Sequence, residues 1–339
     1  MSHPVLDFRS DTLTQPCKQM RNIISEARVG DSFYGEDPSV NELESFTAKL
    51  FGHEAAIFVP SGTMSNQIAV QLHCRSGESV ICAPDLHIIR AESGGLSALA
   101  GVQHVSPRIE QGFMLCEQSL DNTFVGRDSL VTPSTTLMVL ENTHLWSGGK
   151  IHPMQHMKTL SSWCKKNEVS LHLDGARLWH AHVETGIPLV EFAALFDSLS
   201  VCFSKGLGAP AGSCLISSGQ NIKKAQMLRK RLGGTMRQAG HLAAAAHWAL
   251  VNNLSRLKDD HIMAKRLARW FQAHLPEAKI EEPETNIVLL RFKSPVQNKI
   301  DELFSKYSIR LSALNSHTLR AVCHKDIPAE QFNCLVAEV

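Results

Sequence analysis

Short apolar runs alternate with helical patterns through the first two thirds of the sequence, and this alternation limits the fold more than any other feature. Seven runs have the length and apolar content of buried strands: EAAIFVP, ESVICAP, GVQHVSP, TTLMVLEN, VSLHLDGA, LSVCFS and SCLISS. Helix-like segments such as GTMSNQIAVQLHC and PMQHMKTLSSWCKKN lie among them. Strands and helices in this arrangement form a mostly parallel sheet with both faces covered. We therefore predict an α/β fold with a mostly parallel, seven-stranded sheet.

The pattern changes near Ala239. A long helical stretch, HLAAAAHWALVNNLSRLKDDHIMAKRLARWFQAHL, is followed by the alternating patterns TNIVLLRF, SPVQNKIDELFSKY, IRLSAL and TLRAVCH. A chain of 339 residues with 43% hydrophobic content can bury a large core and a smaller second one. We predict an N-terminal arm over residues 1–25, a large domain over 26–240 and a small C-terminal α+β domain over 241–339.

Charge and cysteine content narrow the function classes. The net charge is +1 without long runs of one sign, so a nucleic-acid partner, which needs a concentrated basic face, is not expected. No apolar run approaches the roughly 18 residues of a membrane span, and the first residues lack the apolar stretch of a signal peptide. The nine cysteines are scattered without CxxC spacing, which favours reduced thiols over disulfides or zinc. We expect a cytoplasmic protein that binds a small molecule and its own copies.

Chemically reactive side chains follow four of the predicted strands. In open α/β sheets, ligands bind beyond the carboxyl ends of the strands. The groups at these ends are Ser61-Gly62-Thr63 after AAIFVP, His87 after VICAPD, Asp174 with Arg177 after SLHL, and Lys205 after SVCFS. A glycine between two hydroxyl residues at the start of a helix suits a bound phosphate.

Pyridoxal phosphate is the cofactor that requires all four kinds of group. It needs a lysine for the Schiff base, an acid facing the pyridine nitrogen, a flat group over the ring and a phosphate cup. Lys205, Asp174 and His87 suit the first three roles, and Gly62 with Thr63 suits the cup. We therefore predict a pyridoxal-phosphate enzyme.

Seven motifs in order, DFRSDTLTQP, VGDSFYGEDPSVNELE, FVPSGTMSNQIAV, LENTH, LHLDGARLWHA, SVCFSKGLGAPAGS and GGTMRQAG, closely resemble the low-specificity L-threonine aldolases. The resemblance covers almost the whole chain. It implies pyridoxal-phosphate fold type I, the aspartate aminotransferase fold. It also implies an aldehyde-lyase that cleaves L-threonine and L-allo-threonine to glycine and acetaldehyde, in threonine catabolism and glycine synthesis. Such enzymes are usually homotetramers built from two close dimers.

The resemblance also implies a role for each matching residue. Lys205 would carry the cofactor, Asp174 would face its pyridine nitrogen, and His87 would stack on its ring and take the proton of the β-hydroxyl, directly or through a water. Gly62 and Thr63 would hold the phosphate.

The remaining matched residues concern the substrate and the neighbouring subunit. Arg177 would lie near the phenolic oxygen of the cofactor and the substrate carboxylate, which Ser10 and Arg320 would clamp. Tyr34 would contribute to a site across the dimer interface. Lys230 and Arg237 would reach the site of the neighbouring subunit. The active site would then need two chains.

Some positions depart from the pattern of the family. An ungapped alignment puts Val131 where a second histidine near the substrate hydroxyl is usual, and Ala91 where an aromatic residue is usual. These changes leave the threo or erythro preference open. Cleavage of a bulkier β-hydroxy amino acid, or β-elimination, remains an alternative reaction.

Two other classes of site have weaker support. The segment GLGAPAG suggests a dinucleotide-binding protein, but its glycine spacing misses GxGxxG. His172, His180 and His182 are close in sequence, but strand and helix geometry would point them apart, so no metal site is expected.

Overall fold

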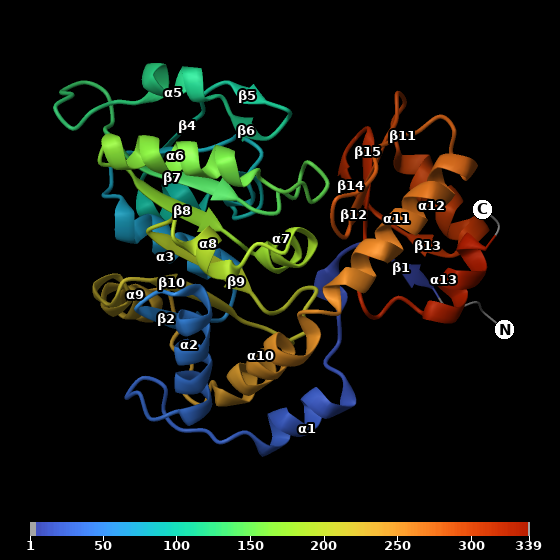
Figure 1. Cartoon of the computed structure of the whole chain (residues 1–339), viewed down its shortest axis with the longest axis horizontal. Helices are drawn as coiled ribbons and strands as arrows, with labels where there is room; N and C mark the ends of the chain where they lie inside the picture. Colours follow the sequence, from blue (N-terminus) through green and yellow to red (C-terminus); the bar gives the residue numbers. More distant parts are fainter. Residues whose placement is uncertain (1–4, 338–339) are drawn as a thin grey trace.

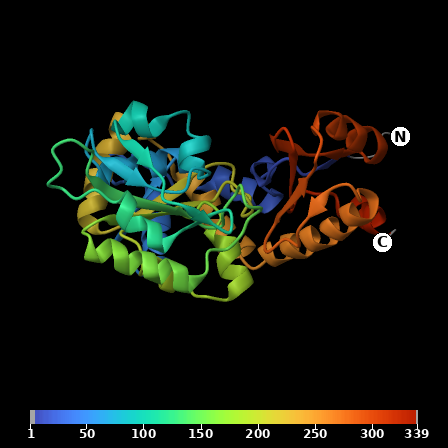
Figure 2. The same cartoon turned by 90° about the horizontal axis from the view of Figure 1, so that it is seen from above.

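A computed structural model describes residues 5–337 of the chain. The polypeptide forms a large part and a small part that lie side by side (Figures 1 and 2). Each part has its own hydrophobic core, one including Leu43, Leu173 and Ile216, the other Phe8, Trp270 and Leu290. No helix among residues 5–337 is long and apolar enough to cross a membrane.

The large part is built on a seven-stranded sheet of order β2-β10-β9-β8-β7-β3-β4. The strands are β2 (Ala55–Val59), β3 (Ser79–Ile81), β4 (Gln103–Val105), β7 (Thr135–Glu141), β8 (Ser170–Asp174), β9 (Ser198–Cys202) and β10 (Ser213–Ser217). They coincide with the seven predicted runs. Within this sheet β10 is antiparallel to both of its neighbours, and the other pairs are parallel. The predicted α/β class and mostly parallel sheet are confirmed.

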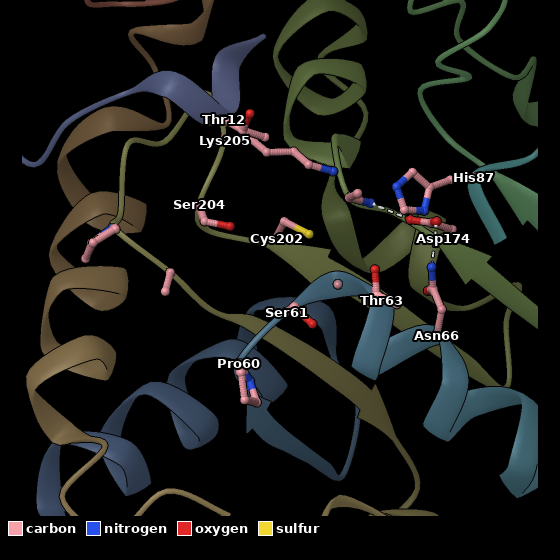
Figure 3. Close-up of a pocket in the computed structure, with 14 residues that line it drawn as sticks. Thr12, Pro60, Ser61, Thr63, Asn66, His87, Asp174, Cys202, Ser204 and Lys205 are labelled. Atoms are coloured by element: carbon pink, nitrogen blue, oxygen red, sulfur yellow. Dashed lines mark hydrogen bonds between the residues drawn. The ribbon is translucent and has the colours of Figure 1, made fainter. Parts of the chain in front are cut away.

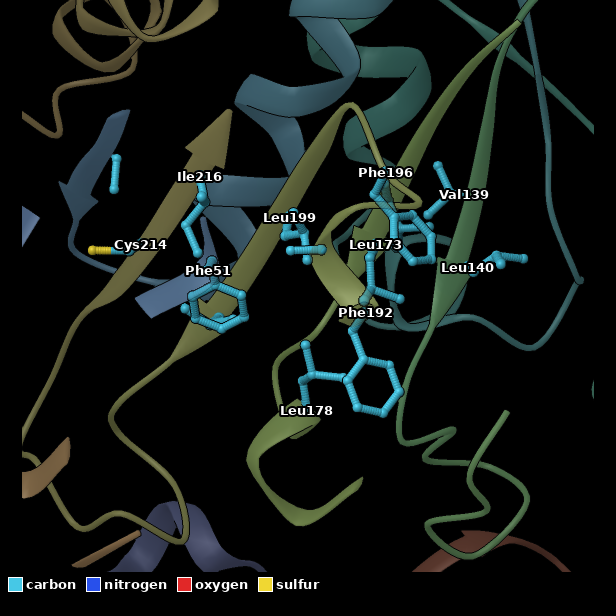
Figure 4. Close-up of a cluster of buried hydrophobic side chains, with 14 of the residues drawn as sticks. Phe51, Val139, Leu140, Leu173, Leu178, Phe192, Phe196, Leu199, Cys214 and Ile216 are labelled. Atoms are coloured by element: carbon cyan, nitrogen blue, oxygen red, sulfur yellow. The ribbon is translucent and has the colours of Figure 1, made fainter. Parts of the chain in front are cut away.

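Helices cover both faces of this sheet because alternate strand residues point to opposite sides. Ile57 of β2 and Leu215 of β10 pack with α3 (Gly62–His73) and α9 (Gly219–Arg231). Their neighbours Phe58 and Ile216 belong to the main core, which includes α2 (Pro38–Phe51). Figure 4 shows this core, with the aromatic rings of Phe51 and Phe192 beside side chains of the sheet.

The remaining elements complete the large part. They are α1 (Lys18–Glu26), α4 (His87–Arg90), a π-helical turn (Leu96–Ala100), β5 (Ile109–Glu110), β6 (Met114–Leu115), α5 (Glu117–Thr123), α6 (Met154–Lys166), α7 (Leu178–Thr185) and α8 (Leu189–Ala193). A 3₁₀ helix (Asp11–Leu13) precedes α1.

The small part is α+β, as predicted. Its antiparallel sheet has the order β11-β12-β15-β14. The elements are β11 (Lys279–Ile280), β12 (Ile287–Arg291), β14 (Ser312–Asn315), β15 (Thr318–Val322), α11 (Leu257–His274), α12 (Gln297–Tyr307) and α13 (Ala329–Val336). The N-terminal strand β1 (Leu6–Asp7) pairs in parallel with β13 (Ile309–Arg310). The first residues that the structure describes therefore lie in the small part.

The long helical stretch after Ala239 is two helices. The first, α10 (Gly240–Asn253), packs against α1 and α2, and the second is α11. Leu250 and Leu257 belong to the core of the large part, and Ala264 belongs to the core of the small part. The domain limits predicted at residues 25 and 240 stay a prediction.

Candidate active site

The carboxyl ends of the parallel strands border a cavity of about 350 Å³ (Figure 3). The cavity is lined by five of the residues predicted for cofactor binding: Gly62, Thr63, His87, Asp174 and Lys205. The structure therefore brings together groups that lie up to 143 positions apart in sequence (205 − 62 = 143). Ser61 of the predicted phosphate-binding segment also lines the cavity, as do Thr12, Asn66, Cys202 and Ser204, which were not predicted.

The first turn of α3 forms one wall of the cavity. Ser61 caps this helix, and its Oγ accepts a hydrogen bond from Met64 N at 3.2 Å. A Cβ on Gly62 would lie 2.7 Å from Cys202 Sγ, so only glycine lets the helix approach β9 this closely. A helix N-terminus with free backbone N–H groups favours an anion, which suits the predicted phosphate cup.

Asp174 ends β8 and is buried at 3% exposure. Its Oδ2 accepts a hydrogen bond from Asn66 Nδ2 at 2.7 Å, and its Oδ1 accepts one from Ala176 N at 3.1 Å. Asn66 lies three residues after Thr63, on the same face of α3. The helical spacing i, i+3 was therefore the signal that could have identified Asn66.

His87 begins α4, where the backbone and the ring are both held by acids. Its backbone N donates to Glu141 Oε2 at 2.7 Å, and its Nδ1 lies 2.9 Å from Glu92 Oε1. Burial lowers the pKa of His87, but the hydrogen bond that Nδ1 donates to Glu92 and the charge of Asp174 outweigh it, so the pKa is raised overall. Since Nδ1 faces Glu92, Nε2 is the atom left to exchange a proton.

The same acid connects the histidine to the rest of the site. Glu92 Oε1 also accepts from Asn66 Nδ2 at 2.8 Å, and Oε2 accepts from Gln67 Nε2 at 2.7 Å. Asn66 thus bridges Glu92 and Asp174. Burial, together with Asp174, raises the pKa of the neighbouring Glu141 to about 7.

Lys205 lies in the loop between β9 and β10, and its amine points toward Asp174 and His87 (Figure 3). This loop joins two antiparallel strands, whereas a dinucleotide fingerprint requires a turn from a strand into a helix. Gly206, Gly208 and Gly212 therefore do not form a dinucleotide site.

Arg177 is buried and forms an ion pair that the sequence reasoning missed. Its Nε and Nη2 donate to Asp11 Oδ2 and Oδ1 at 2.9 and 2.7 Å. Burial disfavours the charged form of both groups. The pairing outweighs this effect, so the pKa of Arg177 is raised and the pKa of Asp11 is lowered. Asp11 follows Ser10 in the RSDT motif, which was the available signal.

Arg320 on β15 lies near this ion pair. Burial, and then repulsion by Arg177, lowers the pKa of Arg320 to about 10. Its Nη2 donates to Arg9 O at 3.1 Å, and its buried Nε has no hydrogen-bond partner among residues 5–337. Ser10 caps the 3₁₀ helix, accepting from Thr12 N at 3.2 Å. The carboxylate clamp of Arg320 and Ser10 stays a prediction.

The three residues expected at a subunit interface lie in a different region of the protomer from the first cavity. Tyr34 and Lys230 line a second cavity of about 680 Å³, and Tyr34 is 70% exposed. Lys230 Nζ and the Arg237 guanidinium lie 5.1 and 5.5 Å from the ring centre of Phe33. Within one protomer, the structure does not bring these three residues into the first cavity.

The three histidines that are close in sequence have separate partners. His172 Nδ1 lies 2.8 Å from Ser198 Oγ, His180 Nδ1 lies 2.9 Å from His261 Nε2, and His182 Nδ1 lies 2.7 Å from Ile187 O. Among the described residues, ligand atoms of His87, Glu92 and Asp174 do lie within 4.8 Å of one another, but hydrogen bonds from Asn66 and His87 already join them.

Val131 is 94% exposed in the segment before β7. Val131 precedes β7, which runs about 20 Å from Thr135 to Glu141 beside the site, and it is not among the residues that line the cavity.

Comparison with known proteins decides the family. The family model for beta-eliminating lyases matches residues 7–295. The chain belongs to the beta-eliminating lyase family. Its relatives include low-specificity L-threonine aldolase 1 of Arabidopsis thaliana, which is 38% identical over 95% of this chain and 92% of that protein.

Solved structures place this family member in a known fold. Leishmania major threonine aldolase has a TM-score of 0.83 at 21% identity, covering 99% of this chain and 98% of that chain. SPT solved with PLP has a TM-score of 0.75 at 16% identity, covering 98% of this chain and 86% of that chain. The predicted fold type I is confirmed.

Proposed function

We propose that this chain is a pyridoxal-phosphate-dependent aldolase that cleaves L-threonine, L-allo-threonine and other β-hydroxy-α-amino acids to glycine and an aldehyde. The observation that carries the proposal is the cavity in which Lys205, Asp174, His87 and the N-terminus of α3 converge. The threonine aldolase relatives support the choice of reaction.

The residues present fit the cofactor by their chemistry. When bound, pyridoxal phosphate supplies an aldehyde that condenses with amines and a ring that withdraws electrons from the substrate Cα. Lys205 would hold the aldehyde carbon, Asp174 the ring nitrogen, and the first turn of α3 the phosphate. His87 would lie over the ring. Gly62 and Thr63 of this turn both line the cavity, and the absence of a side chain on Gly62 lets the turn lie close to β9, which supports this arrangement.

The protein would orient the amino acid by its carboxylate. Arg320 has a buried, unpaired Nε, and Arg177 lies close enough to depress its pKa, so an added carboxylate would satisfy both a hydrogen-bond donor and an excess of positive charge. With the carboxylate fixed, Nε2 of His87 would take the proton of the β-hydroxyl as the aldehyde leaves. Glu92 would keep Nδ1 protonated during this transfer.

The complete enzyme would be a homotetramer of two close dimers in the cytoplasm, acting in threonine catabolism and glycine synthesis. Tyr34, Lys230 and Arg237 would complete the site of a neighbouring subunit. Their position away from the first cavity of their own protomer, and the exposure of Phe33 and Tyr34, support a shared site.

A second candidate is aldol cleavage of a bulkier β-hydroxy amino acid, or β-elimination. Val131 favours it, because this exposed residue does not line the first cavity and so would supply no contact to a substrate hydroxyl within the protomer.

The test is product analysis with the cofactor-loaded protein. L-threonine and L-allo-threonine should yield equimolar glycine and acetaldehyde, and Lys205→Ala should abolish both the visible band of the lysine-bound cofactor and turnover. Lys158→Ala, an exposed lysine on α6, is the matched control. Ammonia and a keto acid as products would support β-elimination, and a protein that stays colourless with added pyridoxal phosphate would overturn the proposal.

A further inference from the structure

The backbone of the Lys205 loop is held by side chains that do not line the cavity. Three consecutive carbonyl oxygens, those of Lys205, Gly206 and Leu207, each lie within hydrogen-bond distance of an outside donor: Thr14 Oγ1 at 2.9 Å, Arg256 Nη2 at 3.1 Å and Asn253 Nδ2 at 2.7 Å. We call Thr14, Asn253 and Arg256 the loop clamp.

The loop that they hold has little room to adjust. Gly208 N donates to Lys205 O at 2.8 Å, which closes a tight turn, and Gly208 has a φ of +83°. A Cβ on Gly206 would lie 2.9 Å from both His180 Nε2 and Leu257 Cδ2. Since Gly206 and Leu207 are buried, a carbonyl that loses its donor cannot turn to water without moving the turn.

The clamp side chains are themselves fixed. Both terminal nitrogens of Arg256 donate to the carboxylate of Asp260 at 2.8 Å, and Asp260 is buried. The Thr14 hydroxyl lies 2.9 Å from Asp11 O as well as from Lys205 O, so its single proton is shared and its contribution is the weakest. Asn253 donates to a single carbonyl, and its hydrogen bond of 2.7 Å is the shortest of the three.

The clamp residues lie where the chain passes between the two cores. Phe8 belongs to the small core and Met20 to the large one, and Thr14 lies between them. Leu257 belongs to the large core and Ala264 to the small one, and Asn253 with Arg256 immediately precede this second passage. Both connections between the parts therefore contact the turn that carries the lysine.

We propose that Thr14, Asn253 and Arg256 are positioning residues for Lys205, which couple the placement of the small part to the position of the lysine amine. The inference rests on the proposed function, because it assigns Lys205 the task of holding the cofactor. A lysine whose turn is displaced by about 1 Å is expected to react roughly 100-fold more slowly.

The chain offers a matched pair for the test. Asn253→Ala removes a clamp donor, whereas Asn252→Ala removes an exposed neighbour whose Nδ2 donates to Trp248 O at 2.8 Å in its own helix. Backbone hydrogen exchange of residues 203–212 and kcat on L-threonine are measured for both. We expect Asn253→Ala to speed exchange of this peptide, but not of β8, and to lower kcat about 10- to 100-fold. Asn252→Ala should change neither quantity.

A second variant keeps the test decisive if Asn253→Ala folds poorly. Arg256→Lys retains the charge but loses the fork that joins Asp260 to Gly206, and Arg269→Lys, at an exposed site on α11, is its control. Wild-type exchange at 203–212 and wild-type kcat in the folded clamp variant would overturn the proposal. Turnover by Lys205→Ala would instead overturn the proposed function, and the exchange result would show separately whether the clamp exists.

Discussion

At the scale of single residues, the site depends on polar partners that join distant segments. Asn66 contacts Glu92 and Asp174, and Glu92 contacts the half-buried His87, so four side chains share one network. Each member limits the protonation and orientation of the next. Substitutions in this network should therefore change pKa values as well as stability.

Glu92→Gln should lower the pKa of His87, because it removes the partner that opposes the effect of burial. In the native protein the folded pKa lies above the unfolded value of about 6.5, so protonated His87 stabilises the fold below that pH, and this contribution is lost as pH rises through the folded pKa. In the variant this loss should shrink or disappear. NMR titration of His87 and unfolding midpoints between pH 5 and 9 measure it.

The matched control is Glu117→Gln, which changes an exposed acid at the start of α5. An unchanged His87 titration in Glu92→Gln would contradict the role of this pair.

Gly62→Ala should destabilise the protein by about 1–3 kcal/mol, because the new Cβ would lie 2.7 Å from Cys202 Sγ. Removing the sulfur should relieve the contact. We expect the double variant Gly62→Ala/Cys202→Ala to have a higher Tm than Gly62→Ala alone, measured without cofactor. A Tm no higher in the double variant would show that the sulfur is not the obstacle.

At the scale of secondary structure elements, one carboxylate caps two helices. Asp37 Oδ1 accepts from Ser39 N and Val40 N at 3.1 Å at the start of α2, and Oδ2 accepts from Gly240 N at 2.8 Å at the start of α10. Asp37 is fully buried. It ties together two helices that lie about 200 positions apart in sequence (240 − 37 = 203).

Asp37→Ala should lower the free energy of unfolding by about 2–4 kcal/mol, since it removes a helix cap and leaves buried N–H groups unpaired. Urea unfolding followed by circular dichroism measures the change. Asp259→Ala, an exposed aspartate in the first turn of α11, should cost far less. Equal losses in the two variants would contradict the double-cap role.

The seven strands of the large part were predictable because their apolar runs are short, regular and separated by turn residues. Lys205, Asp174 and His87 were found for the same reason, since strand ends mark the binding edge of such a sheet. The break at residues 254–256 was not predicted, because the helical pattern continues across it without proline or glycine. Asp11 and Glu92 were missed because their partners become neighbours only in the folded chain.

At the scale of the whole molecule, the Asp11–Arg177 pair joins the N-terminal segment to the end of the central sheet. Burial alone would raise the pKa of Asp11, but Arg177 lowers it below its usual value of 3.8. The pair therefore stabilises the protein above about pH 4, and this contribution is lost as pH falls through the lowered pKa.

Asp11→Asn should destabilise the protein at neutral pH by about 3–5 kcal/mol, because Arg177 is left buried without its countercharge. The difference from the native protein should narrow below pH 4. Thermal unfolding at pH 7 and pH 3 measures both effects, with Asp301→Asn on the exposed face of α12 as control. A difference that stays constant with pH would contradict the charge pairing.

The antiparallel strand β10 also has a consequence for the order of folding. Its pairing with β9 spans only the turn at residues 203–212, whereas its pairing with β2 joins Val59 to Ser213 across most of the large part. Local pairing closes a short loop and is the faster event. In pulsed hydrogen exchange during refolding, we expect the β10 amides bonded to β9 to gain protection before those bonded to β2. The turn that carries the Lys205 amine would then form before β2 and the helix that follows it complete the cavity. The cofactor would therefore bind only after a late step of folding.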